Sequence, residues 1–151
     1  SGIGFEMIIE TNEKSLWPVN VLHMMMFSQI LISSGMVEGD LLEYNDIFPI
    51  SEAVIKNSDI RSFVAITPDQ RISYPMGFDL STGKVDFFPL FGITTSEEKL
   101  ILDDKLKINL TEFFEKAGYP IVDPLRKGIT SNEINVINKK NIININDYNK
   151  N

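Results

Sequence analysis

The chain has 151 residues, of which 43% are hydrophobic and 23% charged, and its formal net charge at pH 7 is -7. This length and composition predict one globular domain with a sizeable core. The sequence contains no cysteine, which excludes a disulfide framework, a thiolate nucleophile and a cysteine zinc site. The negative charge argues against nucleic acid or an anionic membrane as a partner, because both would repel it.

The first part of the chain predicts a strand and a long helix. Residues 5–11 alternate between apolar and polar side chains, which favours a strand. Ser15 is the expected N-cap of a helix that has Pro18 in its first turn and ends before Gly35. Apolar residues occur all around this helix, including the methionine run 24–26. We therefore expect the helix to be mostly buried.

A loop and three strands are predicted next. Residues 35–50 mix glycine, acidic and aromatic side chains without a regular period, which indicates a loop with short extended pieces. Residues 63–66 read as a strand. Residues 76–80 and 84–90 read as two further strands, and the intervening residues 81–83 are a hairpin signal.

Two helix starts are marked in the second half of the chain. Thr95 and Glu98 have the spacing of a capping box, in which each side chain binds a backbone N–H at the start of the helix. Asn109 and Glu112 form a weaker version of the same pattern. The helix that begins after Asn109 is expected to end at Gly118.

The C-terminal segment is rich in asparagine, isoleucine and lysine. Residues 134–136 and 143–146 alternate in polarity, which predicts a late hairpin, with a partly disordered tail as the alternative. We therefore divide the chain into a domain, residues 1–130, and a hairpin or tail, residues 131–151. Strands and helices are mixed without strict alternation, so the predicted fold class is α+β.

Few residues are suited to catalysis or to metal binding. His23 is the only histidine and lies within the apolar helix, where we interpret it as structural. The sequence has no G-x-S-x-G turn and no phosphate-binding glycine pattern. Asp103 and Asp104 lack the ligand spacing of a calcium loop, and Glu97 and Glu98 suit a helix N-terminus. We predict a chain that is not an enzyme and holds no metal or cofactor, with a carboxylate-dependent hydrolase as the less favoured alternative.

Four segments of the sequence are informative through their order and separation. The segments are residues 1–6 (SGIGFE), 16–22 (LWPVNVL), 85–92 (VDFFPLFG) and 121–128 (IVDPLRKG). Each is weak by itself. In this order and at these separations they resemble the suppressor of fused domain, and the match spans about residues 1–130, most of the chain.

The resemblance implies a mixed sheet with helices packed on it, and a protein that binds other proteins. Animal members of this family bind and restrain a transcription factor. Many single-domain bacterial members look like immunity proteins that neutralise a cognate toxin. The family pattern has further strands before the Gly-Phe-Glu segment at residues 4–6, so we expect this chain to lack N-terminal strands of that domain. The resemblance carries over no catalytic residue.

We therefore predict a cytoplasmic, non-catalytic protein-binding domain, an immunity protein that occludes a cognate bacterial toxin. A regulatory adaptor with a different protein partner is the alternative, and the oligomeric state is left open. The acidic charge favours a basic toxin domain as the partner. Partner contacts are predicted at exposed positions of the 35–50 loop, which mixes acids with aromatic residues. These positions are Glu38, Asp40, Glu43, Tyr44 and Asp46.

Apolar residues of the same loop are expected to strengthen the contact with the partner. These anchors are Met36, Leu41, Tyr44 and Phe48, and their packing beneath the loop is the alternative.

Four residues of the resembling segments are predicted to have structural roles. Trp17 is expected to fill the core and Pro18 to open the long helix. Asp123 and Arg126 flank a proline turn, where we expect them to form a local ion pair. A direct contact with the partner is the alternative role for this pair.

Overall fold

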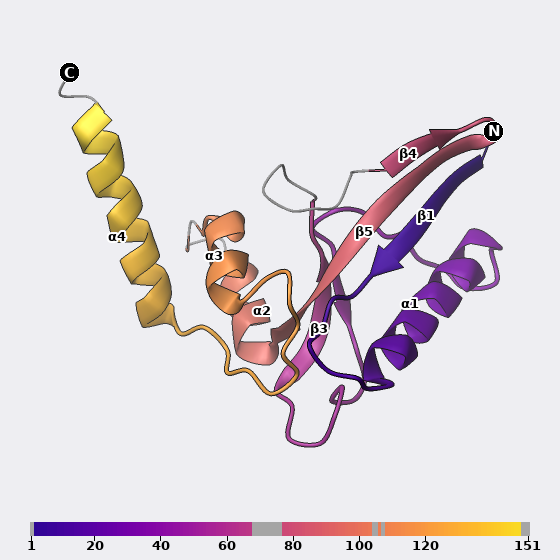
Figure 1. The fold of residues 1–151 in the computed structure, drawn as a ribbon, viewed down its shortest axis with the longest axis horizontal. Coiled ribbons are helices and arrows are strands. Elements are labelled where there is room, and N and C mark those ends of the chain that lie inside the picture. The colour runs from indigo at the N-terminus through magenta and orange to yellow at the C-terminus, as the bar shows by residue number, and fades with distance from the viewer. Residues whose placement is uncertain (1, 68–76, 104–105, 107, 149–151) are drawn as a thin grey trace.

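A five-stranded mixed sheet carries the fold, as the computed structural model shows (Figure 1). The strand order is β1-β5-β3-β2, and β4 pairs with β5 beside this path. The strands are β1 (Gly2–Ile8), β2 (Ile47–Pro49), β3 (Ile60–Ala65), β4 (Gly77–Leu80) and β5 (Gly83–Thr94). The structure describes residues 2–67, 77–103, 106 and 108–148.

Strand β5 joins the two parts of the sheet because it is long enough to pair with different strands along its length. From Gly83 to Pro89 it pairs in parallel with β1, and from Leu90 to Thr94 it pairs antiparallel with β3. Pro89 is the last residue paired with β1, so its missing N–H lies at the changeover between the two ladders. The β4–β5 hairpin confirms the predicted pair of strands, and β5 extends four residues beyond its predicted end.

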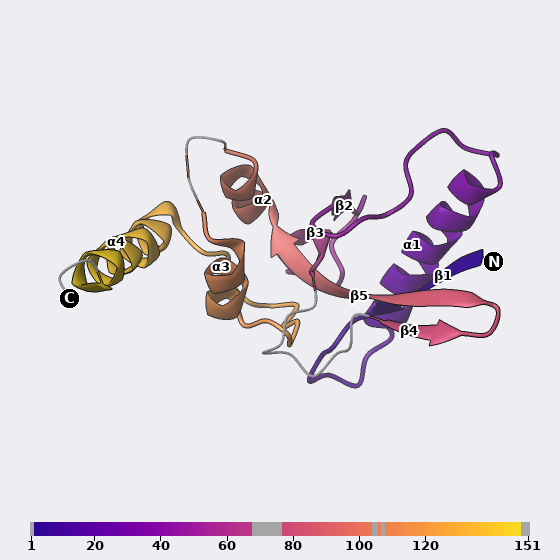
Figure 2. The same ribbon diagram turned by 90° about the horizontal axis from the view of Figure 1, so that it is seen from above.

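Helix α1 (Trp17–Ser33) packs beside β1 at one end of the sheet (Figure 2). The predicted start was one residue early, since the N-cap is Leu16, and Pro18 lies in the first turn as predicted. The side facing the sheet buries residues four apart, Trp17, Val21, Met25 and Gln29.

The prediction that α1 is mostly buried was wrong. Val19, Phe27 and Ile30 are 44%, 62% and 54% exposed, and His23 is exposed rather than a core histidine. The sheet is a single layer beside α1, so it can cover only one side of the helix.

Helices α2 (Thr95–Ile101) and α3 (Leu110–Ala117) lie near the other end of β5. The capping box of α2 is formed by Thr94 and Glu97, one residue before the predicted pair. Thr94 ends β5 in an extended conformation, which places its side chain at the N-cap. The predicted Asn109 cap of α3 is confirmed, and so is its end at Gly118, whose φ of 105° favours glycine.

The C-terminal segment forms a helix, α4 (Ser131–Tyr148), in place of the predicted hairpin or tail. Thr130 and Glu133 cap it reciprocally: Glu133 Oε2 accepts from Thr130 N at 2.9 Å, and Thr130 Oγ1 accepts from Glu133 N at 3.4 Å. Ile134 is only 1% exposed, so the first turn is anchored in the core. Beyond this turn α4 extends away from the sheet in both views (Figures 1 and 2). The prediction was wrong because the alternation of Asn and Ile was interpreted as a strand pattern, and the capping spacing of Thr130 and Glu133 was not recognised.

Aromatic and branched side chains from both ends of the sheet share one core. The ring centres of Trp17 and Phe63 lie 6.3 Å apart, and those of Phe91 and Phe114, which pack edge-on, lie 5.9 Å apart. The predicted core role of Trp17 agrees with its 4% exposure. Among the helices in the described part of the chain, none is long and apolar enough to cross a membrane.

The Thr130 cap makes a testable prediction about α4. Thr130→Ala removes the hydroxyl that binds Glu133, and it should cost about 1 kcal/mol of stability in the first turn of α4. Far-UV circular dichroism during thermal unfolding measures this loss, with Ser131→Ala at the neighbouring exposed position as the control. Equal losses in both variants would show that the cap does not hold the helix.

The stability that the Thr130–Glu133 cap contributes should depend on pH. Hydrogen bonds from the Thr130 backbone and hydroxyl, and then the charge of Lys116, lower the pKa of Glu133. A carboxyl whose pKa is lowered by folding stabilises the native state above its unfolded pKa of about 4.3 and loses that contribution as the pH falls through the lower folded value. In the Thr130→Ala variant, the loss of stability as the pH falls should therefore be smaller.

Candidate protein-binding surface

The loop between α1 and β2 is held at defined points. The Leu42 backbone N–H donates to Gln29 Oε1 at 2.7 Å, which ties the middle of the loop to the buried side of α1. Asn45 N donates to Ala65 O and Ala65 N to Asp46 O, which tie the end of the loop to β3. The loop is therefore irregular in conformation but attached at both of these places.

Three of the predicted contact residues, Glu38, Asp40 and Glu43, are exposed on this loop. Asp46 is exposed as well, but its carboxylate accepts from Glu43 N at 2.8 Å and closes a local turn. The four acids are thus all exposed on this loop, and Asp46 also shapes it.

Tyr44 anchors the loop from beneath. Its hydroxyl donates to Phe87 O at 2.9 Å, and its ring packs 4.6 Å from the Phe88 ring. Burial raises the pKa of Tyr44, and the charge of Asp86 raises it further. Of the predicted apolar anchors, Tyr44 and Phe48 pack against the core.

The other two predicted anchors, Met36 and Leu41, are 75% and 50% exposed.

A second exposed feature, the outer face of α1, lies directly before this loop. We define the α1 outer face as Leu16, Val19, His23, Phe27 and Ile30. Sequence reasoning expected the helix as a whole to be mostly buried and did not predict this exposed face. The sequence did contain a signal for this exposed face: the helix is apolar on all sides, and one sheet layer can cover only one of them.

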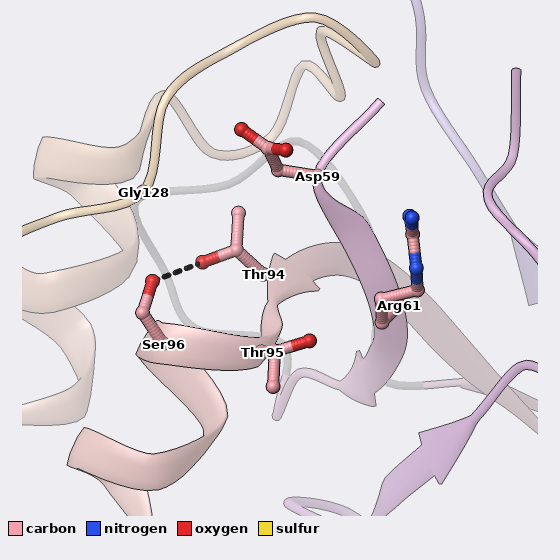
Figure 3. Close-up of a pocket in the computed structure, with 6 residues that line it drawn as sticks. All are labelled: Asp59, Arg61, Thr94, Thr95, Ser96 and Gly128. Atoms are coloured by element: carbon pink, nitrogen blue, oxygen red, sulfur yellow. Dashed lines mark hydrogen bonds between the residues drawn. The ribbon is translucent and has the colours of Figure 1, made fainter. Parts of the chain in front are cut away.

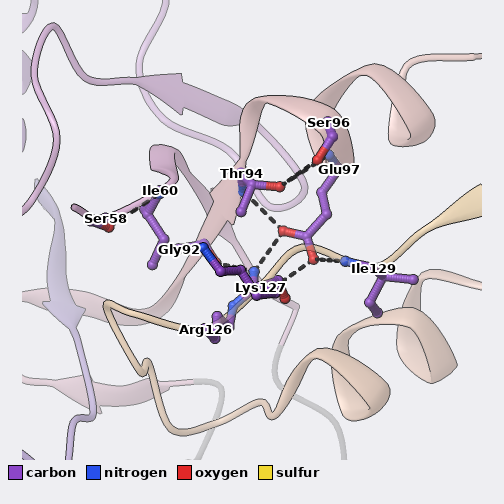
Figure 4. A network of polar contacts seen from close by, with 9 residues as sticks. All are labelled: Ser58, Ile60, Gly92, Thr94, Ser96, Glu97, Arg126, Lys127 and Ile129. Carbon is purple, nitrogen blue, oxygen red and sulfur yellow. Dashed lines mark hydrogen bonds and ion pairs between the residues drawn. The ribbon is translucent and has the colours of Figure 1, made fainter.

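A buried ion pair joins α2 to the C-terminal segment (Figure 4). Glu97 is 0% exposed, and both of its oxygens accept from Arg126 at 2.7 Å, a bidentate pair. Glu97 also accepts from Thr94 N at 2.8 Å and from Ile129 N at 2.9 Å. A buried carboxylate with four donors is fully satisfied, which makes this a structural site.

The guanidinium of Arg126 makes two further contacts. Its Nη2 donates to Gly92 O at 2.7 Å, and its Cζ lies 5.1 Å from the Phe91 ring centre. Gly128 lets this segment approach α2, because a Cβ there would lie 2.5 Å from Thr94 Oγ1.

The predicted ion pair between Asp123 and Arg126 was wrong in its partner. Asp123 Oδ1 accepts from Leu125 N at 2.9 Å and shapes the turn, while Arg126 reaches Glu97, 29 residues earlier. Sequence spacing favoured the nearer acid, and only the packing of the turn against α2 reveals the true partner.

A shallow polar hollow of about 250 Å³ opens beside the start of α2 (Figure 3). Its arginine, Arg61, donates to Ser58 O and Ile60 O, and its acid, Asp59, pairs with Lys127 at 3.1 Å. These groups are thus engaged with the protein itself. The lining residues are Asp59, Arg61, Thr94, Thr95, Ser96 and Gly128.

Metal sites and hydrolase sites both require acidic side chains that converge. Among them, no group of three or more His, Cys, Asp and Glu side chains is placed to hold a metal ion. The hollow beside α2 has one carboxylate, Asp59, and a second hollow beside α1 also has one, Glu52. Neither provides the acid pair of a hydrolase.

Comparison with known proteins agrees with this architecture. The family model of the suppressor of fused protein (SUFU) matches residues 1–127. The chain belongs to the suppressor of fused family. No individual curated protein sequence matches this SUFU domain at a significant level.

Two solved structures share the SUFU fold with this chain. The SUFU homologue of Neisseria gonorrhoeae FA 1090 has a TM-score of 0.55 at 16% identity, covering 83% of this chain and 63% of that one. Drosophila Suppressor of Fused has a TM-score of 0.55 at 16% identity, covering 89% of this chain and 29% of that one. This chain thus spans less than two thirds of the length of either protein. The likeness confirms the predicted α+β fold with helices packed on a mixed sheet.

The buried ion pair predicts that removing Arg126 lowers the unfolding free energy of this SUFU domain far more than removing the neighbouring Lys127. Arg126→Met removes the cation that pairs with the buried Glu97 carboxylate, which should cost about 3–5 kcal/mol of unfolding free energy. Lys127→Met removes an exposed pair with Asp59 and should cost less than about 1 kcal/mol. Urea unfolding measures both values.

A double variant keeps this test informative if Arg126→Met folds poorly. Combining Glu97→Gln with Arg126→Met removes the lone buried charge and should recover part of the lost stability. Similar costs for Arg126→Met and Lys127→Met would show that the buried pair does not anchor the fold.

Proposed function

We propose that this SUFU domain is a non-catalytic protein-binding domain in the cytoplasm, and that it is an immunity protein that neutralises a cognate basic toxin by occlusion. The observation that carries the proposal is the α1–β2 loop, where Glu38, Asp40 and Glu43 are exposed on a segment tied to α1 and β3. Carboxylates on an attached segment can meet a basic surface without a large ordering cost.

The charge of the whole chain supports the same kind of partner. A net charge of -7 attracts a basic protein from a distance and speeds their encounter. Affinity then requires apolar contact, and Met36 and Leu41 are exposed on the same loop to provide it. A regulatory adaptor would use this surface in the same way, so the identity of the partner decides between the two functions.

Co-expression with the product of the neighbouring gene tests the immunity function. If that product is the cognate toxin, the SUFU domain should rescue growth and form a complex with it on size exclusion. A stable complex with a non-toxic product would support the adaptor. Failure both to rescue growth and to form a complex would refute the immunity function.

Charge reversal on the loop tests where this partner binds. Changing Glu38, Asp40 and Glu43 to lysine should slow association by about tenfold or more and flatten its dependence on salt, because steering by exposed charges is screened. Stopped-flow mixing with the co-purified partner measures both effects. Reversal of Glu6, Asp79 and Glu115, which are exposed elsewhere, is the control. Equal effects of the two triple variants would place the interface outside this loop.

A further inference from the structure

The α1 outer face has an unusual combination of exposure and composition. Phe27 and Ile30 are 62% and 54% exposed, yet α1 from Trp17 to Ser33 contains no Asp, Glu, Lys or Arg. A helix side that faces only water normally has charged residues. An uncharged, half-exposed helix of this kind is typical of a surface that another molecule covers.

The exposed residues also have the spacing of an interface. Leu16, Val19, His23, Phe27 and Ile30 follow one another at intervals of three or four, so they form one stripe along the helix. From Val19 to Ile30 the stripe is about 16 Å long. This length matches about three turns of a second helix lying alongside.

A hollow of about 280 Å³ adjoins this stripe. Asn20 and Met24 lie on the helix between the stripe and the buried side, and they form one wall of the hollow. Residues 50–54 form the opposite wall, and Glu52 contributes a carboxylate to it. The hollow has room for one large apolar side chain, with an acid nearby.

The charges that flank α1 along the chain are almost all negative. Between residues 13 and 46 the chain has five carboxylates and one lysine, and none of these charges lies within α1. An apolar stripe with acids at its margins is complementary to a segment with an apolar centre and basic margins.

We propose that the α1 outer face is the apolar centre of the partner interface, and that its occupant is a basic amphipathic helix of another protein. This inference rests on the proposed protein-binding function and specifies the partner's chemistry. The helix lies along α1, inserts one apolar side chain beside Met24, and directs lysine or arginine toward Glu38, Asp40 and Glu52. A second copy of this chain is a poorer occupant because two such acidic margins would repel each other.

Titration with synthetic peptides tests this proposal on the full chain. The probe is a peptide of about 18 residues, long enough to form a helix, with leucine on one face and lysine on the other. One control peptide has glutamate in place of lysine, and another has the leucine–lysine composition in scrambled order. The wild-type protein should bind the amphipathic lysine peptide at least about tenfold more tightly than either control.

Matched variants of the protein locate the binding site. Phe27→Ser with Ile30→Ser removes two residues of the α1 outer face. Leu102→Ser with Leu125→Ser removes two residues of nearly equal exposure, 63% and 52%, elsewhere on the molecule. The first pair should weaken binding of the lysine peptide by about tenfold or more, and the second should leave it unchanged.

Several results would overturn the inference. These are no binding of the lysine peptide, equal binding of either control peptide, and equal losses in the two double variants. Self-association of the wild-type protein that Phe27→Ser with Ile30→Ser abolishes would assign the face to a second copy.

The test also separates this inference from the proposed function. A complex with the neighbouring gene product that forms with unchanged affinity in the Phe27→Ser, Ile30→Ser variant would refute the docking face and leave the protein-binding function standing. Site-specific peptide binding without any such complex would support the docking face and count against the immunity function.

Discussion

The bidentate ion pair between Glu97 and Arg126 is the interaction on which the arrangement of the second half of the fold depends. It joins the end of β5, the first turn of α2 and the segment that leads to α4, since Glu97 also accepts from Thr94 N and Ile129 N. Burying a carboxylate is costly unless donors satisfy its lone pairs. The end of β5, the start of α2 and the segment before α4 must therefore all be in place around Glu97. The pair therefore defines one geometry more than it adds net stability.

The scaffold leaves two kinds of surface exposed at its other end. Gln29 and Tyr44 hold the α1–β2 loop, so its carboxylates are presented from attached backbone. The same helix that buries Trp17 and Met25 against the sheet exposes Phe27 and Ile30 on its opposite side. The acidic loop follows this apolar side of α1 directly along the chain, and the proposed binding of a basic protein depends on both.

Local signals explain most of what the sequence predicted correctly. The β4–β5 hairpin, the Asn109 cap and the end of α3 at Gly118 all depend on residues within a few positions of one another. The same reasoning misplaced the α2 cap by one residue, because Thr94 and Thr95 are chemically equivalent until the end of β5 is known. It missed α4 because alternation of Asn and Ile concealed the Thr130–Glu133 cap.

By itself, the sequence determined the fold class, the family and the acidic character of the loop, because these follow from composition, motif order and turn chemistry. The tertiary structure alone decided that Arg126 pairs with Glu97 rather than with Asp123, and which side of α1 meets solvent. The physical reason is the same in both cases. An ion pair and a buried face are chosen by elements that are distant along the chain, and an apolar helix has no local signal to show which of its sides the sheet will cover.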